Sequence, residues 1–196
     1  MSATTIKEKA LRCIDEVYPS DSDINDTHFP VEQFLSEAVR WVIDVLPLHI
    51  LTIRDKASAK GGDIEDGVVT YLSDDLRDAR LVYFKMEDWV RPADIIFEDS
   101  PLYRQQKNRI LRGTPSRPVV VRMMDDTTVE AYTSNVDTNQ DGEVYVVKYD
   151  AANIPAKAED LCAWKLAEIV LLSMSDAQNA SVCTARVSEI LEQLAL

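Results

Sequence analysis

The chain has 196 residues, of which 46% are hydrophobic and 28% charged, and its formal net charge is −13. This composition excludes wholesale disorder, and the length allows one core or one core with a sizeable insertion. Because the chain is this acidic, it cannot bind nucleic acid over its whole surface, and any contact with phosphates must be local.

No apolar run approaches the roughly 18 residues that span a bilayer. The opening residues, MSATTIKEKALR, lack the apolar region of a secretory signal. We therefore expect a soluble intracellular protein with no membrane contact. Cys13, Cys162 and Cys183 lie far apart and without metal-ligand spacing. They predict buried, small hydrophobic side chains rather than disulfides or a zinc site.

In chain order, apolar residues at helical spacing predict a short helix up to Pro19 and a second helix over about 30–46. Residues 54–66, RDKASAKGGDIED, are small, charged and glycine-containing, and predict a mobile loop. Short apolar or alternating runs then predict strands. These runs are 68–72, 81–84, 90–97, 118–123, 127–134 and 143–149. Asp141-Gly142 is a turn signal, which predicts that the last two strands form a hairpin.

The C-terminal quarter returns to helical spacing. Residues 159–174 are apolar on most faces, which predicts a helix buried on more than one side by its own chain or by a neighbouring copy. A last helix follows, capped by Ser175 or Asp176. We expect an α+β fold with three sequence regions. Residues 1–66 (helices and the mobile loop) and 151–196 form one small helical bundle, and residues 67–150 are an inserted β-subdomain.

The basic stretch 97–123, from Phe97 to Met123, inverts the charge of the chain. It has no carboxylate between Pro101 and Met124, and without its six basic residues the rest of the chain would carry −19 instead of −13. The six are Arg104, Lys107, Arg109, Arg112, Arg117 and Arg122. We expect an extended segment that contacts a neighbouring copy, a phosphate backbone or carboxylates of its own domain, and charge alone does not choose between these.

One motif resembles a calcium site. Asp137, Asn139, Asp141 and Gly142 match the opening of an EF-hand loop, but position twelve is Lys148 instead of an acid. We therefore prefer a hairpin turn and expect no bound metal or cofactor.

Catalytic motifs are also missing from the sequence. His28 and His49 have no nucleophile or acid at motif spacing, and there is no glycine-rich phosphate loop. We expect no catalytic residues and no enzymatic activity. Paired acids such as Asp74/Asp75 leave a hydrolase as a further alternative, because the convergence of carboxylates in space cannot be read from sequence.

The run SPLYRQQKNRILRGTPSRPVVV and the order of elements resemble the head-to-tail connector, or neck ring, proteins of tailed bacteriophages. The resemblance is closest to the ring proteins beneath the portal in crAss-like phages. The Tyr-Arg-Gln-Gln-Lys-Asn and Arg-Gly-Thr-Pro-Ser-Arg-Pro runs, ending in a strand, carry it. It covers most of the chain in layout and residues 100–121 in motif.

The resemblance implies a structural virion protein, assembled in the host cytoplasm, that forms a closed ring, usually twelve-fold, in the neck. The implied partners are copies of itself, the portal and other neck or tail proteins, while genomic DNA passes through the channel without specific binding. A ring joins two different faces of one subunit, so an anionic body with a cationic extension is self-complementary.

We expect six residues of the basic stretch to be the partner-binding residues, with Tyr103 filling a pocket on the partner. They are Tyr103, Arg104, Lys107, Arg109, Arg112 and Arg117. The alternative is a nucleic-acid-binding accessory protein that uses residues 103–122 on phosphates.

Overall fold

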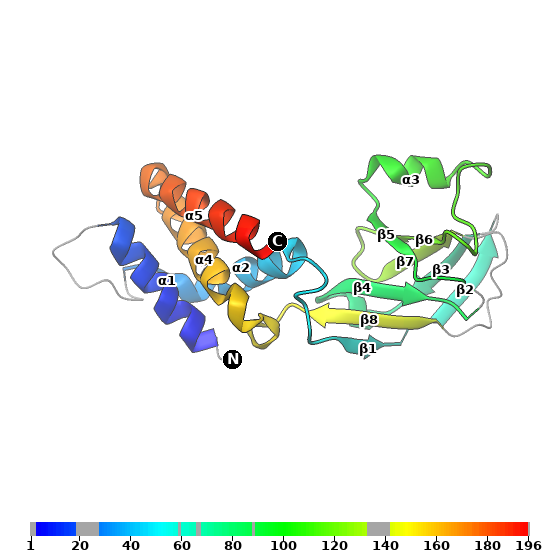
Figure 1. The fold of residues 1–196 in the computed structure, drawn as a ribbon, viewed down its shortest axis with the longest axis horizontal. Helices are drawn as coiled ribbons and strands as arrows, with labels where there is room; N and C mark the ends of the chain where they lie inside the picture. Colours follow the sequence, from blue (N-terminus) through cyan, green and yellow to red (C-terminus); the bar gives the residue numbers. More distant parts are fainter. Residues whose placement is uncertain are drawn as a thin grey trace. The chain divides into compact units, whose positions relative to one another are not determined.

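The computed structural model describes residues 3–18, 28–58, 60–65, 68–87, 89–132 and 142–195. The described part contains both helices and two β-sheets, which confirms the α+β class. The chain forms two compact units: a helical unit, Met1–Ile53 with Tyr149–Leu196, and a β unit, Arg54–Lys148, inserted between its halves (Figure 1).

In the described part of the helical unit there are four long helices: α1 (Ala3–Val17), α2 (Val31–Val45), α4 (Glu159–Ser173) and α5 (Ala177–Ala195). Helix α4 packs against the other three, and its Leu161, Leu166 and Val170 are fully buried. The burial predicted for this helix is therefore supplied by its own chain. Asp176 caps α5, because its Oδ1 accepts the Asn179 N–H at 3.1 Å.

Charged side chains also tie the helices together. Lys9 of α1 contacts Glu159 at 2.9 Å and Asp160 at 2.6 Å. These acids lie in the first turn of α4, where the helix dipole favours negative charge. Further along α4, Lys165 contacts Glu168 at 3.0 Å and lies 4.5 Å above the ring of Trp41. Helix α4 is thus fixed to both α1 and α2 by polar as well as apolar contacts.

The β unit contains two sheets. A three-stranded antiparallel sheet has the order β1 (Asp55–Ala57), β8 (Glu143–Lys148), β4 (Ala79–Lys85). A five-stranded sheet has the order β2 (Lys60–Glu65), β3 (Val68–Leu72), β7 (Thr128–Tyr132), β6 (Val119–Arg122), β5 (Asp94–Phe97). Only the β5–β6 pair of these strands is parallel. The remaining short elements are α3 (Pro101–Gln106) and the 3-10 helices η1 (Asp74–Leu76), η2 (Ala151–Asn153) and η3 (Ala156–Ala158).

Both sheets contribute to one hydrophobic core. Tyr71 and Val129 of the five-stranded sheet and Phe84 and Val146 of the three-stranded sheet are buried in the same cluster. The rings of Tyr71 and Phe84 meet edge to face, 5.1 Å apart. The Ala93 N–H also donates to the Phe84 carbonyl at 2.9 Å, which joins the sheets where β4 and β5 approach.

The predicted mobile loop over residues 54–66 is wrong, because this segment contains β1 and β2. Strand β1 pairs with β8, and β2 pairs with β3. Each therefore lies at the edge of its sheet, a position where small and charged residues are common. The β unit accordingly starts at Arg54 rather than at the predicted residue 67.

The predicted hairpin between the last two strands is also wrong. Strand β7 pairs with β3 and β6, whereas β8 pairs with β1 and β4, so the two strands belong to different sheets. Residues 133–142 are too long a connection for a two-residue turn, and both strands reach the common core from separate sheets. Asp137, Asn139 and Asp141 of the calcium-like motif lie outside the described residues.

The burial of the three cysteines yields the first prediction. Burial raises the pKa of Cys13 and Cys162 to about 12 and that of Cys183 to about 11. The thiolate is the reactive form, and at pH 8 its fraction at a pKa of 11 is about one in a thousand. We expect no reaction of the native chain with dithiobis(nitrobenzoate) at pH 8, and three equivalents after denaturation in urea. Fast labelling of the native chain would contradict this packing.

Candidate functional site

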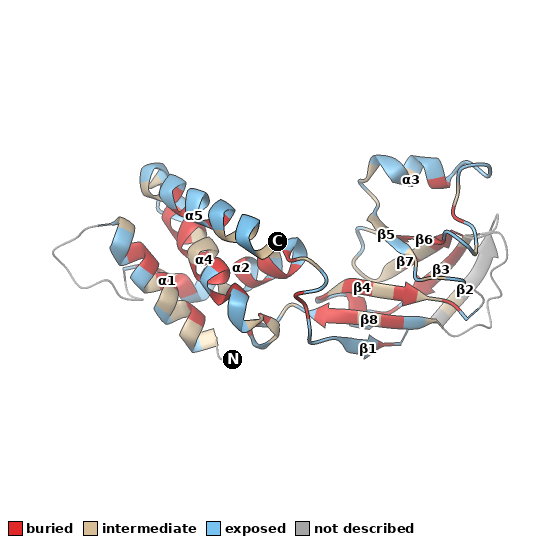
Figure 2. Cartoon of the chain, in the orientation of Figure 1, coloured by how far each residue is buried: buried red, intermediate tan, exposed pale blue. Residues whose placement is uncertain are grey.

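The basic stretch is not one extended segment. Ser100 caps a helical turn by accepting the Leu102 N–H on its Oγ at 3.3 Å, and Pro101 occupies the first helical position of α3. Residues 107–117 then form a loop that returns the chain to β6. We call residues 101–117, α3 with this loop, the basic arm; Figure 2 shows α3 as largely exposed.

Tyr103 holds the arm to the five-stranded sheet. Its hydroxyl donates to Glu130 Oε2 at 3.2 Å, and its ring packs edge to face on Tyr132, 6.5 Å between centroids. Burial and the neighbouring Glu130 raise the pKa of Tyr132, so this tyrosine stays a neutral hydrogen-bond donor. Lys107 lies 4.5 Å above the Tyr103 ring. The structure thus gives Tyr103 an intramolecular role, and its contact with a partner stays a prediction.

Gly113 fixes the C-terminal part of the arm to the five-stranded sheet. Its N–H donates to Gln106 Oε1 at 2.9 Å, and Gln106 is only 5% exposed. A Cβ at this position would lie 2.4 Å from the Tyr132 carbonyl oxygen and 2.8 Å from the Val119 nitrogen. Only glycine allows the backbone to approach the sheet this closely. The arm is therefore attached to β6 and β7 at its base.

Between these attachments Asn108 organises a tight turn. Its carbonyl accepts the N–H groups of Leu111 and Arg112, both at 3.0 Å, and its Oδ1 accepts the Ile110 N–H at 3.0 Å. Despite this order, Ile110 is 90% exposed and Leu111 is 59% exposed. The turn therefore presents two aliphatic side chains to solvent in a conformation set by its own hydrogen bonds.

The apolar pair lies in sequence between Arg109 and Arg112, and the arm carries three further cations. Arg104, Lys107, Arg109 and Arg117 are exposed, and Arg112 is half-buried. Within the described residues, neither Arg104 nor Lys107 nor Arg117 makes an ion pair with a carboxylate. The neighbouring Tyr103, Glu130 and Glu98 raise the pKa of Lys107, so this lysine interacts with acids of its own domain. For Arg104 and Arg117, no ion pair within the described part of the domain explains their charge.

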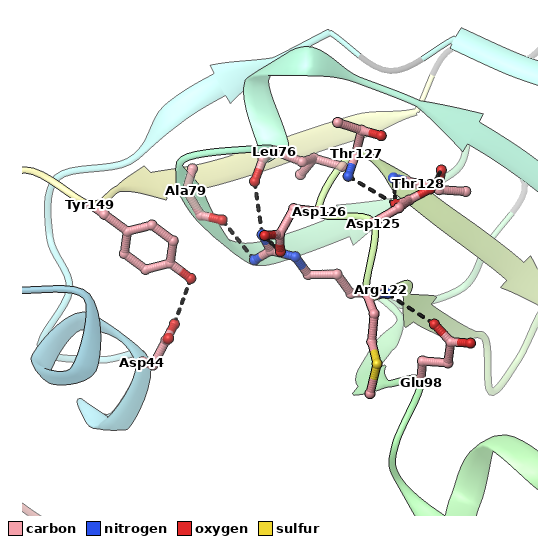
Figure 3. A network of polar contacts seen from close by, with 11 residues as sticks. Asp44, Leu76, Ala79, Glu98, Arg122, Asp125, Asp126, Thr127, Thr128 and Tyr149 are labelled. Atoms are coloured by element: carbon pink, nitrogen blue, oxygen red, sulfur yellow. Dashed lines mark hydrogen bonds and ion pairs between the residues drawn. The ribbon is translucent and has the colours of Figure 1, made fainter. Parts of the chain in front are cut away.

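Arg122, the sixth basic residue of the stretch, does not belong to this surface. It is 4% exposed, and its guanidinium donates to the carbonyls of Leu76 at 2.8 Å and Ala79 at 2.7 Å. It also contacts Asp126 at 3.2 Å. Figure 3 shows these partners around its side chain. The alternative that placed residues 103–122 on phosphates therefore loses one of its six cations.

Sequence reasoning missed Ile110 and Leu111. They lie between Arg109 and Arg112 and continue neither a helical nor an alternating pattern. The missing periodicity was the available signal. Apolar residues outside any amphipathic pattern do not belong to the buried face of a helix or strand, which indicates exposure. Their exposure required the structure.

The other candidate chemistry gains no support from geometry. His28 and His49 are both exposed. In the described part of the chain, no group of three or more His, Cys, Asp or Glu side chains is placed to hold a metal ion. Over the same residues, no helix is long and apolar enough to cross a membrane. Neither protein-family models nor curated proteins show a match to this sequence.

Arg122 gives a prediction about stability. Arg122→Met removes two charge-assisted hydrogen bonds to carbonyls and the contact with Asp126. We expect the free energy of unfolding to fall by about 3 kcal/mol, measured by urea unfolding followed by circular dichroism. The matched variant Arg117→Met removes an exposed cation and should change the free energy of unfolding by less than about 0.5 kcal/mol. Equal effects would contradict the internal role of Arg122.

Gly113 gives a prediction about the arm itself. Gly113→Ala places a Cβ against the Tyr132 carbonyl. We therefore expect the free energy of unfolding in urea to fall by about 2 kcal/mol, and trypsin to cleave faster within residues 107–112. Gly142→Ala is the control, because its Cβ would meet the flexible Met86 Sδ at 3.3 Å. Unchanged cleavage of the Gly113 variant would show that the base of the arm is not fixed in this way.

Proposed function

We propose that this chain is a structural protein of a tailed-phage particle that forms a ring in the neck, between portal and tail. It acts there as a head-tail connector that lines the DNA channel, and the basic arm is its contact element. The resemblance of residues 100–121 to connector proteins motivates the proposal. A helical bundle with an inserted β unit agrees with the layout that this resemblance implies.

One observation carries the proposal. An arm that is ordered by its own hydrogen bonds exposes an aliphatic pair, Ile110 and Leu111, among cations of an otherwise acidic chain. Association is weakened when a loop must first be ordered, so a preorganised arm favours binding. Exposed apolar side chains ringed by charge are typical of protein contacts. An anionic remainder suits a channel lining, since like charge resists adhesion of DNA.

The experiment is to determine the mass and shape of particles formed by the chain, alone and co-expressed with a portal protein of the parent phage. Light scattering and negative-stain imaging are the readouts. We expect rings, free or stacked on the portal. A chain that forms no ring under either condition and does not bind the portal would overturn the proposal.

The salt dependence of DNA binding distinguishes the connector from the alternative, a nucleic-acid-binding accessory protein. The five cations of the arm would give a slope of log affinity against log salt of about −4 to −5 if each contacted a phosphate. A connector is expected to show almost no DNA binding at physiological salt. A steep slope together with indifference to the portal would favour the alternative.

A further inference from the structure

We infer that the basic arm docks on a second copy of this chain, with Ile110 and Leu111 entering the contact and the neighbouring arginines pairing with carboxylates of that copy. The inference rests on the proposed function and adds the partner of the arm, a neighbouring subunit rather than the portal or DNA.

Charge complementarity identifies the partner. Residues 101–117 carry five basic residues and no acid, whereas the helical unit carries sixteen acidic against seven basic residues. The β unit outside the arm is acidic as well, with eighteen acidic against nine basic residues. A copy of the chain therefore offers an anionic surface on either unit. A cationic element that enters the contact reduces the repulsion between equally charged copies.

We propose that the contact is heterologous, with the arm of one copy on a different face of the next copy. The arm is held to its own sheet through Tyr103 and Gly113, and its tip points its aliphatic pair away from the core that its own domain provides. A projecting cationic element that meets a different, anionic face of the next copy adds subunits head to tail. Such contacts close into rings when the rotation between subunits allows it.

The aliphatic pair favours a protein surface over phosphates. Ile110 and Leu111 gain free energy only when they leave water, and a phosphate backbone offers no apolar surface. Burial of such side chains at the centre of a contact with charges at its rim matches the anatomy of protein interfaces. Arg104 and Arg117, which make no ion pair with a carboxylate among the described residues, supply the rim.

The test uses two full-length variants of the arm. Ile110→Ser/Leu111→Ser removes the aliphatic pair, and Arg104→Glu/Arg117→Glu reverses two exposed charges. We expect each to raise the concentration needed for half-maximal copy-to-copy association at least about tenfold, measured by sedimentation velocity with and without the portal protein. The serine variant changes only exposed side chains, so it keeps the test valid if the charge reversal disturbs folding.

Matched controls lie elsewhere on the β unit. Leu72→Ser replaces an aliphatic residue that is 61% exposed on β3. Arg77→Glu/Arg91→Glu reverses two exposed cations outside the arm and produces the same change in net charge. Both controls are expected to associate like the unaltered chain, because none of the substituted residues lies within residues 101–117.

Each outcome has one meaning. Arm variants that assemble into rings like the unaltered chain overturn the inference, and arm variants that form free rings but no longer bind the portal overturn it while leaving the proposed function intact. An unaltered chain that shows no copy-to-copy association in either condition also overturns it. Arm-dependent association into open oligomers that ignore the portal supports the inference and overturns the proposed neck function.

Discussion

The close approach of the Gly113 backbone to β6 and β7 is the constraint on which the candidate site depends. Because a Cβ there would lie 2.4 Å from the Tyr132 carbonyl oxygen, only glycine lets the chain lie against the sheet and still bond to Gln106. Tyr103 attaches the other end of the arm through Glu130. Between these attachments Asn108 accepts the N–H groups of Ile110, Leu111 and Arg112, and the side chains of Ile110 and Leu111 are exposed.

Charge acts on a longer scale than these contacts. The acidic residues are spread over both units, whereas five cations are gathered in residues 101–117. In a monomer this separation contributes little, because exposed charges are screened by water and salt. In an assembly of identical copies it favours one orientation, with the arm of one subunit towards the acidic surface of another. In the proposed assembly, the local backbone constraint at Gly113 would position the arm for this contact.

Most elements could be predicted from the sequence, because their periodicity is strong. The strand over 68–72 and the helix over 159–174 agree with β3 and α4 to within a residue. The sheets could not be assigned, because β7 and β8 have the same alternating pattern and nothing local says that they face each other across a core. Edge strands β1 and β2 looked like a loop since their residues are small and charged.

Part of the candidate site could be read from the sequence. The position of the basic stretch and the five cations of the arm follow from composition, and their contact with a partner stays a prediction. The role of Arg122 could not be predicted, because an arginine that donates to buried carbonyls looks the same in sequence as an arginine in solvent. Ser100-Pro101 was a readable helix start, yet the density of positive charge in that stretch suggested an extended segment. The exposure of Ile110 is a tertiary property, decided by attachments at residues 103 and 113.

The most direct measurement is photo-crosslinking from position 110. A chain carrying a photoreactive benzoyl-phenylalanine there is mixed with an isotopically labelled copy, irradiated under assembly conditions with the portal protein and DNA present, and analysed by peptide mass spectrometry. The account predicts mixed-isotope crosslinks to an acidic surface of a second copy. Crosslinks to the portal or to DNA alone, or only within one chain, would contradict it.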